Sequence, residues 1–237
     1  MKFNIIFNIA IIFLLSFGIT SILIPIILQF LSKKRIYDKH TNLKQHTGFI
    51  PTLGGVAIVL GVVISQLFFI LSFPEYRMLF LGYEYLAFCS LILFILGIVD
   101  DIINLDSMLK FLIQFLVSLI MVWKANLYIN SFRGLFGIYE IPAYFSYVIS
   151  IFIIIFLINA FNLIDGIDSI ASVLGITYSI FFALLSFSNS LYPELILSIS
   201  VVGALLSFWY YNKTPSKIFM GDSGTLVIGL IIAFYII

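Results

Sequence analysis

The chain has 237 residues, of which 62% are hydrophobic and only 10% are charged, whereas ordinary soluble domains are about 25% charged. One soluble core of this size cannot bury so much apolar surface, so lipid must be the solvent for much of it. The net charge of +1 provides no basic stripe and argues against nucleic acid as a partner. The single cysteine, Cys89, excludes an intramolecular disulfide.

Long apolar runs predict helices that cross a membrane. A helix needs about 20 apolar residues to cross the hydrocarbon layer, and it satisfies its own backbone hydrogen bonds there. We therefore predict an all-α, polytopic membrane bundle that forms a single domain over residues 1–237, with about eight spans. The predicted spans are 3–31, 53–73, 78–99, 108–127, 143–163, 170–188 and 195–211, and an eighth that begins near Gly224 and is cut off at Ile237.

The Lys and Arg residues predict the orientation, because loops that carry them stay in the cytoplasm. With the N-terminus outside, the inner segments carry eight of the twelve Lys and Arg residues. All seven Asp residues lie in these same inner segments, whereas all four Glu residues lie outside. Because Asp has little effect on insertion, this segregation indicates another cause, and short carboxylates suit a divalent cation. The outer segment 127–142 is expected to form a small β-hairpin.

Two adjacent carboxylates, Asp100 and Asp101, end the third predicted span. They repel one another, which raises a pKa or recruits a cation, and unpaired carboxylates are costly at a membrane boundary. Lys110 and Gln114 lie four residues apart at the start of the next span and share a helix face. A solvated loop with a positive-inside lysine explains the same residues, so both interpretations stay open.

Four polar residues recur at every third position where the fifth predicted span ends, namely Asn159, Asn162, Asp165 and Asp168. On a helix end this spacing stacks them along one stripe. Their amide and carboxylate oxygens suit Mg²⁺ and the hydroxyl groups of a sugar or base. A helix cap with a glycine turn explains Asp165 but not four polar positions in register.

Two further polar segments flank the second and the last span. Asp222 and Ser223 stand at the position of a helix N-cap, and a helix N-terminus between glycines also suits a phosphate. His46 precedes Gly54 and Gly55, which allow close helix packing or close approach of the backbone to a ligand. Two predicted crossings separate each of the four polar segments from the next, so we expect all of them to open on one face of the membrane.

The order and sidedness of these segments resemble the polyprenyl-phosphate N-acetylhexosamine-1-phosphate transferases. This family includes the undecaprenyl-phosphate GlcNAc-1-phosphate transferases and the phospho-MurNAc-pentapeptide translocase. The segments cover four of the family's five cytoplasmic loops, and NLIDGID resembles the GlcNAc branch more closely. The matching segments are KQHTGFIPTLGGVAI (44–58), DDIINLDSMLKFLIQ (100–114), NAFNLIDGIDSIA (159–171) and KIFMGDSGTLVIG (217–229).

The resemblance implies Mg²⁺-dependent transfer of a sugar 1-phosphate from a UDP-sugar, with UDP-GlcNAc expected, to undecaprenyl or another polyprenyl phosphate. UMP is released, Mn²⁺ is a potential substitute, and the product starts a lipid-linked cell-envelope glycan in the bacterial inner membrane. By position, the resemblance implies Asp222 and Asn162 as metal ligands. The implied catalytic residues are Asp100, Asp101 and Asp168. The implied substrate-binding residues are Lys44, His46, Lys110, Asn159 and Asp165.

The chain departs from the family pattern at several positions. Ser169 replaces a usual Gly, Thr225 replaces a usual Ser, and Thr52 replaces an Arg of the GlcNAc branch, which leaves the donor sugar open. The chain also ends inside the eighth predicted span, so we expect it to lack the C-terminal spans of the family and their histidine-containing loop.

Two alternatives to an active transferase follow. The first is an inactive, truncated transferase. The second is an ion-coupled membrane transporter, but transporters bind their ions near the bilayer midplane and often contain repeats, whereas these Asp residues lie at predicted helix ends. The sequence leaves the oligomeric state, including a homodimer, open.

Overall fold

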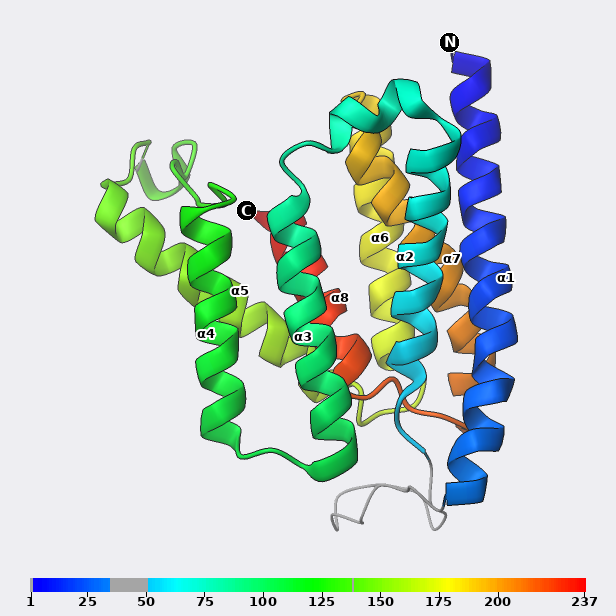
Figure 1. Ribbon diagram of the computed structural model, residues 1–237. Coiled ribbons are helices and arrows are strands. Elements are labelled where there is room, and N and C mark those ends of the chain that lie inside the picture. Colours follow the sequence, from blue (N-terminus) through cyan, green and yellow to red (C-terminus); the bar gives the residue numbers. More distant parts are fainter. Residues whose placement is uncertain (1, 35–50, 138) are drawn as a thin grey trace.

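The computed structural model describes residues 2–34, 51–137 and 139–237 (Figure 1). Within these ranges the chain forms eight α-helices and two short 3-10 helices, with no strand, so the predicted all-α fold is confirmed. The α-helices are α1 (Lys2–Lys34), α2 (Gly54–Ser72), α3 (Glu84–Ile103), α4 (Ser107–Trp123), α5 (Ala143–Ile164), α6 (Ile170–Ser188), α7 (Tyr192–Asn212) and α8 (Asp222–Ile236). The 3-10 helices are η1 (Pro74–Phe80) and η2 (Leu135–Gly137).

Six of the described helices are long and apolar enough to cross a membrane. Helices α4 and α8, with 17 and 15 residues, are apolar but shorter. Many large apolar side chains remain exposed on the outside of the bundle, such as Leu71 and Phe152, which are 77% and 65% exposed. An apolar surface of this extent requires an apolar solvent, so the chain is a multi-pass membrane protein.

Helix α8 lies at the centre of the bundle and organises its packing. All its residues from 223 to 233 are buried, as expected for a helix that is apolar on every face. It packs against α2, α3 and α5, while α1 and α2 pack against α7, and α4 packs against both α3 and α5. The start of α8 is therefore surrounded by the ends of several other helices.

Two glycines allow the close approach of α2 and α3 to the start of α8. A Cβ atom on Gly55 would lie 2.0 Å from the backbone nitrogen of Gly224. A Cβ atom on Gly97 would lie 2.4 Å from the carbonyl carbon of Asp222. Small residues permit such backbone contact between membrane helices. The predicted close packing at Gly54 and Gly55 is thus observed.

Two predictions about the connecting segments are wrong. The third span was expected from residue 78, but residues 74–80 form η1, which Pro74 starts, and α3 begins only at Glu84. The segment 127–142 was expected to be a β-hairpin, but its described residues contain no strand. Gly134 and Gly137 adopt positive φ angles of +87° and +77°, which turn the chain around η2 and prevent a paired ladder.

The bundle has two polar ends. The aspartate end comprises the end of α3, the start of α4, the connection from α5 to α6 and the start of α8, which lie together at the bottom of Figure 1. The tyrosine end comprises Tyr83, Glu194 and Tyr235 and lies at the other end of α3, α7 and α8. The described polar segments thus lie at one end of the bundle, and their location on one face of the membrane stays a prediction.

Candidate active site

The segment 216–223, which runs from the α7–α8 connection into the first turn of α8, is the backbone around which the aspartate end is built. Its carbonyl groups accept hydrogen bonds from the first residues of α2: Gly54 N donates to Phe219 O at 3.0 Å and Gly55 N to Met220 O at 2.7 Å. Phe219 N in turn donates to Pro51 O at 2.9 Å. The first N–H groups of a helix lack partners within the helix, and here another part of the chain supplies them.

Asp101 caps the first turn of α8 from a neighbouring helix. Its Oδ1 accepts from Asp222 N at 2.9 Å, and its Oδ2 accepts from Ser223 N at 3.1 Å. A carboxylate here satisfies two free N–H groups and faces the positive end of the helix dipole. The expected N-cap at Asp222 or Ser223 is wrong, because Gly221 is the N-cap and Asp222 is the first helical residue. Asp101 already occupies the two N–H groups to which a phosphate was expected to bind.

Asp165 and Asp168, which lie between α5 and α6, hold the same segment. Asp165 accepts from Met220 N at 3.3 Å through Oδ1 and from Gly221 N at 2.8 Å through Oδ2. Asp168 Oδ2 accepts from Ser216 N at 3.3 Å. Together with Asp101, these carboxylates take the backbone N–H groups of Ser216 and of residues 220–223.

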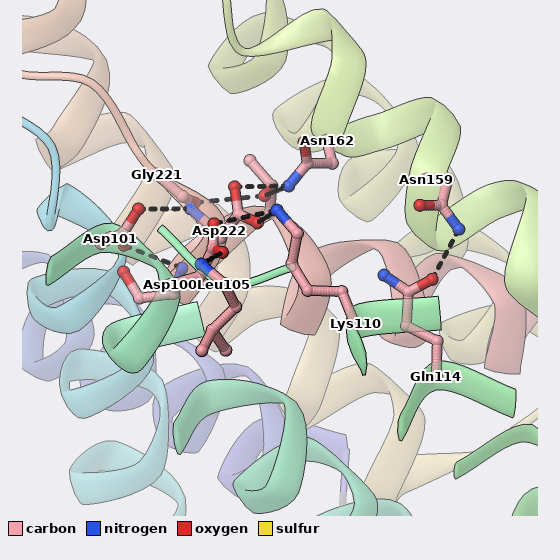
Figure 2. Close-up of polar contacts among 11 residues, drawn as sticks. Asp100, Asp101, Leu105, Lys110, Gln114, Asn159, Asn162, Gly221 and Asp222 are labelled. Carbon is pink, nitrogen blue, oxygen red and sulfur yellow. Dashed lines mark hydrogen bonds and ion pairs between the residues drawn. The ribbon is translucent and has the colours of Figure 1, made fainter. Parts of the chain in front are cut away.

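In a second group of polar residues, the side chains contact one another (Figure 2). Asp222 Oδ1 accepts from Asn162 Nδ2 at 2.7 Å, and Asp222 Oδ2 lies 3.3 Å from Lys110 Nζ. The same ammonium lies 3.0 Å from Asp100 Oδ2, while Asp100 Oδ1 accepts from Leu105 N at 2.8 Å. We call Asp100, Lys110, Asn162 and Asp222 the carboxylate cluster. Two carboxylates share one ammonium there, so the cluster has a net charge of −1 when all three groups are ionised.

The carboxylate cluster is largely shielded from solvent. The side chains of Asp100, Asp222 and Lys110 are 10%, 19% and 27% exposed. Interactions between charges are stronger in such surroundings than in water, so a cation or an anionic ligand that enters the cluster interacts strongly with it. This arrangement suits the binding of a metal ion with a phosphate group.

Thr225 is a member of the site that the sequence analysis missed. Its hydroxyl accepts from Asn162 Nδ2 at 3.0 Å and donates to Gly221 O at 3.1 Å. The hydroxyl thus holds the Asn162 amide beside Asp222. Thr225 follows Asp222 by three residues and shares its helix face, which is the signal that could have revealed it.

The predicted polar stripe on α5 divides into two parts. Helix α5 ends at Ile164, so Asp165 and Asp168 lie beyond it, and the expectation of one continuous helical stripe is wrong. Asn159 lies on the helix but away from the carboxylate cluster, where its Nδ2 donates to Gln114 Oε1 at 2.7 Å. This contact joins α5 to α4. Lys110 and Gln114 share a face of α4, as predicted, and contact different partners.

Three other residues singled out in the sequence lie outside the carboxylate cluster or outside the described residues. Lys44 and His46 lie outside the described residues. Ser169, which stands where a glycine was expected from the resemblance, has a φ angle of +67° immediately before α6. Because glycine adopts this left-handed conformation most readily, the glycine preference at this position has a conformational cause.

The donor set of the carboxylate cluster fits a magnesium ion that is shared with a substrate. Mg²⁺ prefers oxygen ligands and is usually held by one or two carboxylates together with substrate phosphates. Asp100 and Asp222 provide the carboxylates, and Asn162 provides an amide. Among the described residues, no group of three or more His, Cys, Asp or Glu side chains could hold a metal ion by itself. The two carboxylates and the amide are oxygen donors of the kind that such an ion would need, with its other ligands coming from a bound phosphate.

Comparison with known proteins gives the family. The model of glycosyl transferase family 4 matches residues 83–237, which contain the whole carboxylate cluster. The chain is 31% identical over 235 residues to a phospho-N-acetylmuramoyl-pentapeptide-transferase of Listeria monocytogenes, in a match that covers 92% of this chain and 71% of that protein. The chain belongs to glycosyl transferase family 4. The resemblance noted from the four polar segments is thereby confirmed.

Some relatives are named for transfer of N-acetylglucosaminyl 1-phosphate and others for transfer of phospho-N-acetylmuramoyl-pentapeptide. The chain is 33% identical over 223 residues to a Bacillus subtilis protein named "Probable undecaprenyl-phosphate N-acetylglucosaminyl 1-phosphate transferase", covering 94% of this chain. It is 29% identical over 241 residues to a phospho-N-acetylmuramoyl-pentapeptide-transferase of Bacillus licheniformis, covering 95% of this chain. The chain spans 60% of the length of the Bacillus subtilis protein and 72% of that of the Bacillus licheniformis protein.

Proposed function

We propose that this family 4 protein transfers a sugar 1-phosphate from a UDP-sugar to a polyprenyl phosphate in the membrane and releases UMP. The observation that carries the proposal is the carboxylate cluster, in which Asp100 and Asp222 share Lys110 at one end of an apolar helix bundle. The names of the relatives support the reaction type, because each is named as a transferase of a phosphorylated amino sugar. The transporter alternative has no comparable support.

The position of the cluster suits a reaction between a lipid and a water-soluble donor. A polyprenyl phosphate keeps its tail among the apolar helices and presents its phosphate at their ends, where the cluster lies. The excess of Lys and Arg in the expected inner segments favours the cytoplasmic side of the bacterial inner membrane for this end. The UDP-sugar would enter from the same side.

The residues of the cluster have separate tasks in this proposal. Attack of one phosphate on another brings negative charges together, so positive groups must be placed where charge accumulates. Lys110 is such a group, and it lies between the two carboxylates. Asp222 and Asn162, with Asp100 beside them, would hold Mg²⁺, which when bound would neutralise the pyrophosphate of the donor. Asp100 would accept the remaining proton of the acceptor phosphate.

The proposal also specifies the donor sugar. We infer UDP-GlcNAc, because the segment NLIDGID resembles the GlcNAc branch and a relative with 33% identity has that name. Relatives named for the MurNAc-pentapeptide are nearly as similar, so this donor is the comparison that an assay must include.

The test is a transferase assay in membranes that contain the 237-residue chain, with radiolabelled UDP-GlcNAc or UDP-MurNAc-pentapeptide and polyprenyl phosphate. We expect a lipid-linked product from UDP-GlcNAc that requires added Mg²⁺. Asp222→Asn should lower the rate by about 10³-fold, since one transition-state contact contributes about 10²–10³-fold and this residue also holds the metal. Asp106→Asn is the matched control.

Asp106 is an exposed carboxylate that caps α4 by accepting from Met108 N at 3.0 Å, and its replacement should leave the rate unchanged. Equal activity of Asp222→Asn and the wild type would reject the assigned cluster. Absence of product from both donors, in membranes where the folded chain is present, would reject the function proposed for this chain.

A further inference from the structure

The aspartates of the candidate site fall into two classes by what their carboxylates contact. Asp100 and Asp222 belong to the carboxylate cluster and share the ammonium of Lys110. Asp101 and Asp165 instead place both of their oxygens on backbone N–H groups. Asp100 and Asp101 are adjacent in sequence, but neighbouring helical residues point in different directions, so the pair divides between the two classes.

The N–H groups that Asp101 and Asp165 accept belong to four consecutive residues, 220–223. Asp165 takes Met220 and Gly221, and Asp101 takes Asp222 and Ser223. Buried N–H groups must have partners, and the helical pattern of α8 provides none for its first residues. The two carboxylates therefore supply hydrogen-bond acceptors to four consecutive N–H groups of this turn.

The backbone of this turn requires such support. Gly221 has φ +73° and ψ 172°, a conformation that is almost restricted to glycine. A Cβ atom at this position would also lie 2.6 Å from Asp101 Oδ1. Gly97 lies one helical turn before Asp101 and lets α3 approach closely enough for its carboxylate to reach the N–H groups of α8.

We propose that Asp101 and Asp165 are positioning residues that hold the 220–223 turn and thereby fix the side chain of Asp222 in the carboxylate cluster. Asp222 lies within the turn, so the direction of its side chain follows from the backbone that the two carboxylates hold. The contribution of Asp101 and Asp165 to the reaction rests on the proposed function. Their effect on the turn is independent of it and can be measured without substrate.

The decisive measurement is hydrogen–deuterium exchange of the detergent-solubilised chain, followed in peptides that cover residues 218–226. Asn is isosteric with Asp but can accept with only one atom, so Asp101→Asn and Asp165→Asn each leave one N–H facing an amide donor. Hydrogen bonds to charged groups contribute about one to two factors of ten to an equilibrium, so we expect exchange of these amides to rise by about tenfold or more. Asp100→Asn and Asp106→Asn are the controls, and each should change it by less than about twofold.

The activity of the same variants separates positioning from direct reaction. If Asp101 positions Asp222, Asp101→Asn should both speed exchange and lower turnover. The expected decrease in turnover is about 10–100-fold, the factor that corresponds to the loss of one hydrogen bond to a charged group. If Asp101 reacts itself, its replacement should abolish turnover and leave exchange of 220–223 unchanged, and this result would overturn the proposal. Should Asp101→Asn not fold, unchanged exchange in Asp165→Asn would overturn it equally. Because the exchange experiment needs no substrate, its outcome stands even if the transferase assay fails.

Discussion

The two polar ends of the bundle differ in how their charges are arranged. At the tyrosine end, the hydroxyl of Tyr83 donates to Glu194 Oε1, and Tyr235 donates to the backbone carbonyl of Glu194 at 2.8 Å. Ser198 donates to the hydroxyl of Tyr235 at 2.7 Å. Burial and the hydrogen bond to Glu194 raise the pKa of Tyr83, so its hydroxyl remains a donor.

At the aspartate end, like charges lie together. Asp100 and Asp222 approach the same ammonium, and no other Lys or Arg of the described residues forms an ion pair with either carboxylate. A protein that needed only stability would pair each carboxylate or replace it. The comparison shows that polar groups within apolar surroundings do not by themselves mark a site. Crowding of one sign of charge does, because it serves a ligand of the opposite sign.

The largest decrease in transferase activity should come from replacing Lys110, at the aspartate end. Lys110→Gln removes the positive group that both carboxylates share, and we expect transferase activity to fall by about 10²–10³-fold, as for the loss of a preorganised electrostatic contact. Lys124→Gln is the matched control, because Lys124 is exposed at the other end of α4 and should not affect the rate. If Lys110 served only the fold, activity would decrease no more than the amount of folded protein.

The next effect concerns the approach of α3 to α8. Gly97→Ala would place a methyl group against the backbone of Asp222 and Ser223, and the resulting overpacking should destabilise the bundle by about 1–3 kcal/mol. Activity should also fall, because the shift displaces Asp101 from the turn. Gly18→Ala in α1 is the control, since no atom lies within 4 Å of the added Cβ there. Thermal unfolding of the two variants in detergent measures the difference, and equal melting temperatures would contradict the assigned packing role of Gly97.

The sequence predicted the all-α bundle and the site's location well, for a physical reason. Apolar runs of membrane length permit only helices, and helices that alternate in direction return every second connection to the same side. Asp100, Asn162 and Asp222 could therefore be expected at one end although they lie far apart in the chain. The β-hairpin prediction failed because alternating apolar residues around Gly134 and Gly137 fit a glycine-directed turn as well as they fit a strand.

The division of the aspartates could not be predicted. Asp100 and Asp101 are chemically identical, and only the rotation of α3 against α8 determines that one faces Lys110 and the other faces the backbone of Ser223. The end of α5 at Ile164 was expected within one residue, but the break in the polar stripe was not, because the spacing of Asp165 and Asp168 continues the pattern of Asn159 and Asn162. Such distinctions depend on which backbone groups lack partners, and that property belongs to the fold.

The smallest effect on transferase activity should come from a replacement at the tyrosine end. Tyr83→Phe removes the hydroxyl that donates to Glu194 Oε1, and Oε2 of Glu194 is already buried without a partner in the described part of the chain. A hydrogen bond to a carboxylate contributes about 1.5–3 kcal/mol, so the melting temperature should fall, while transferase activity per folded molecule stays at the wild-type value. Tyr85→Phe is the control, because Tyr85 is 39% exposed. A decrease in activity for Tyr83→Phe alone would mean that the two ends of the bundle are functionally coupled, and the separation drawn between them would then be wrong.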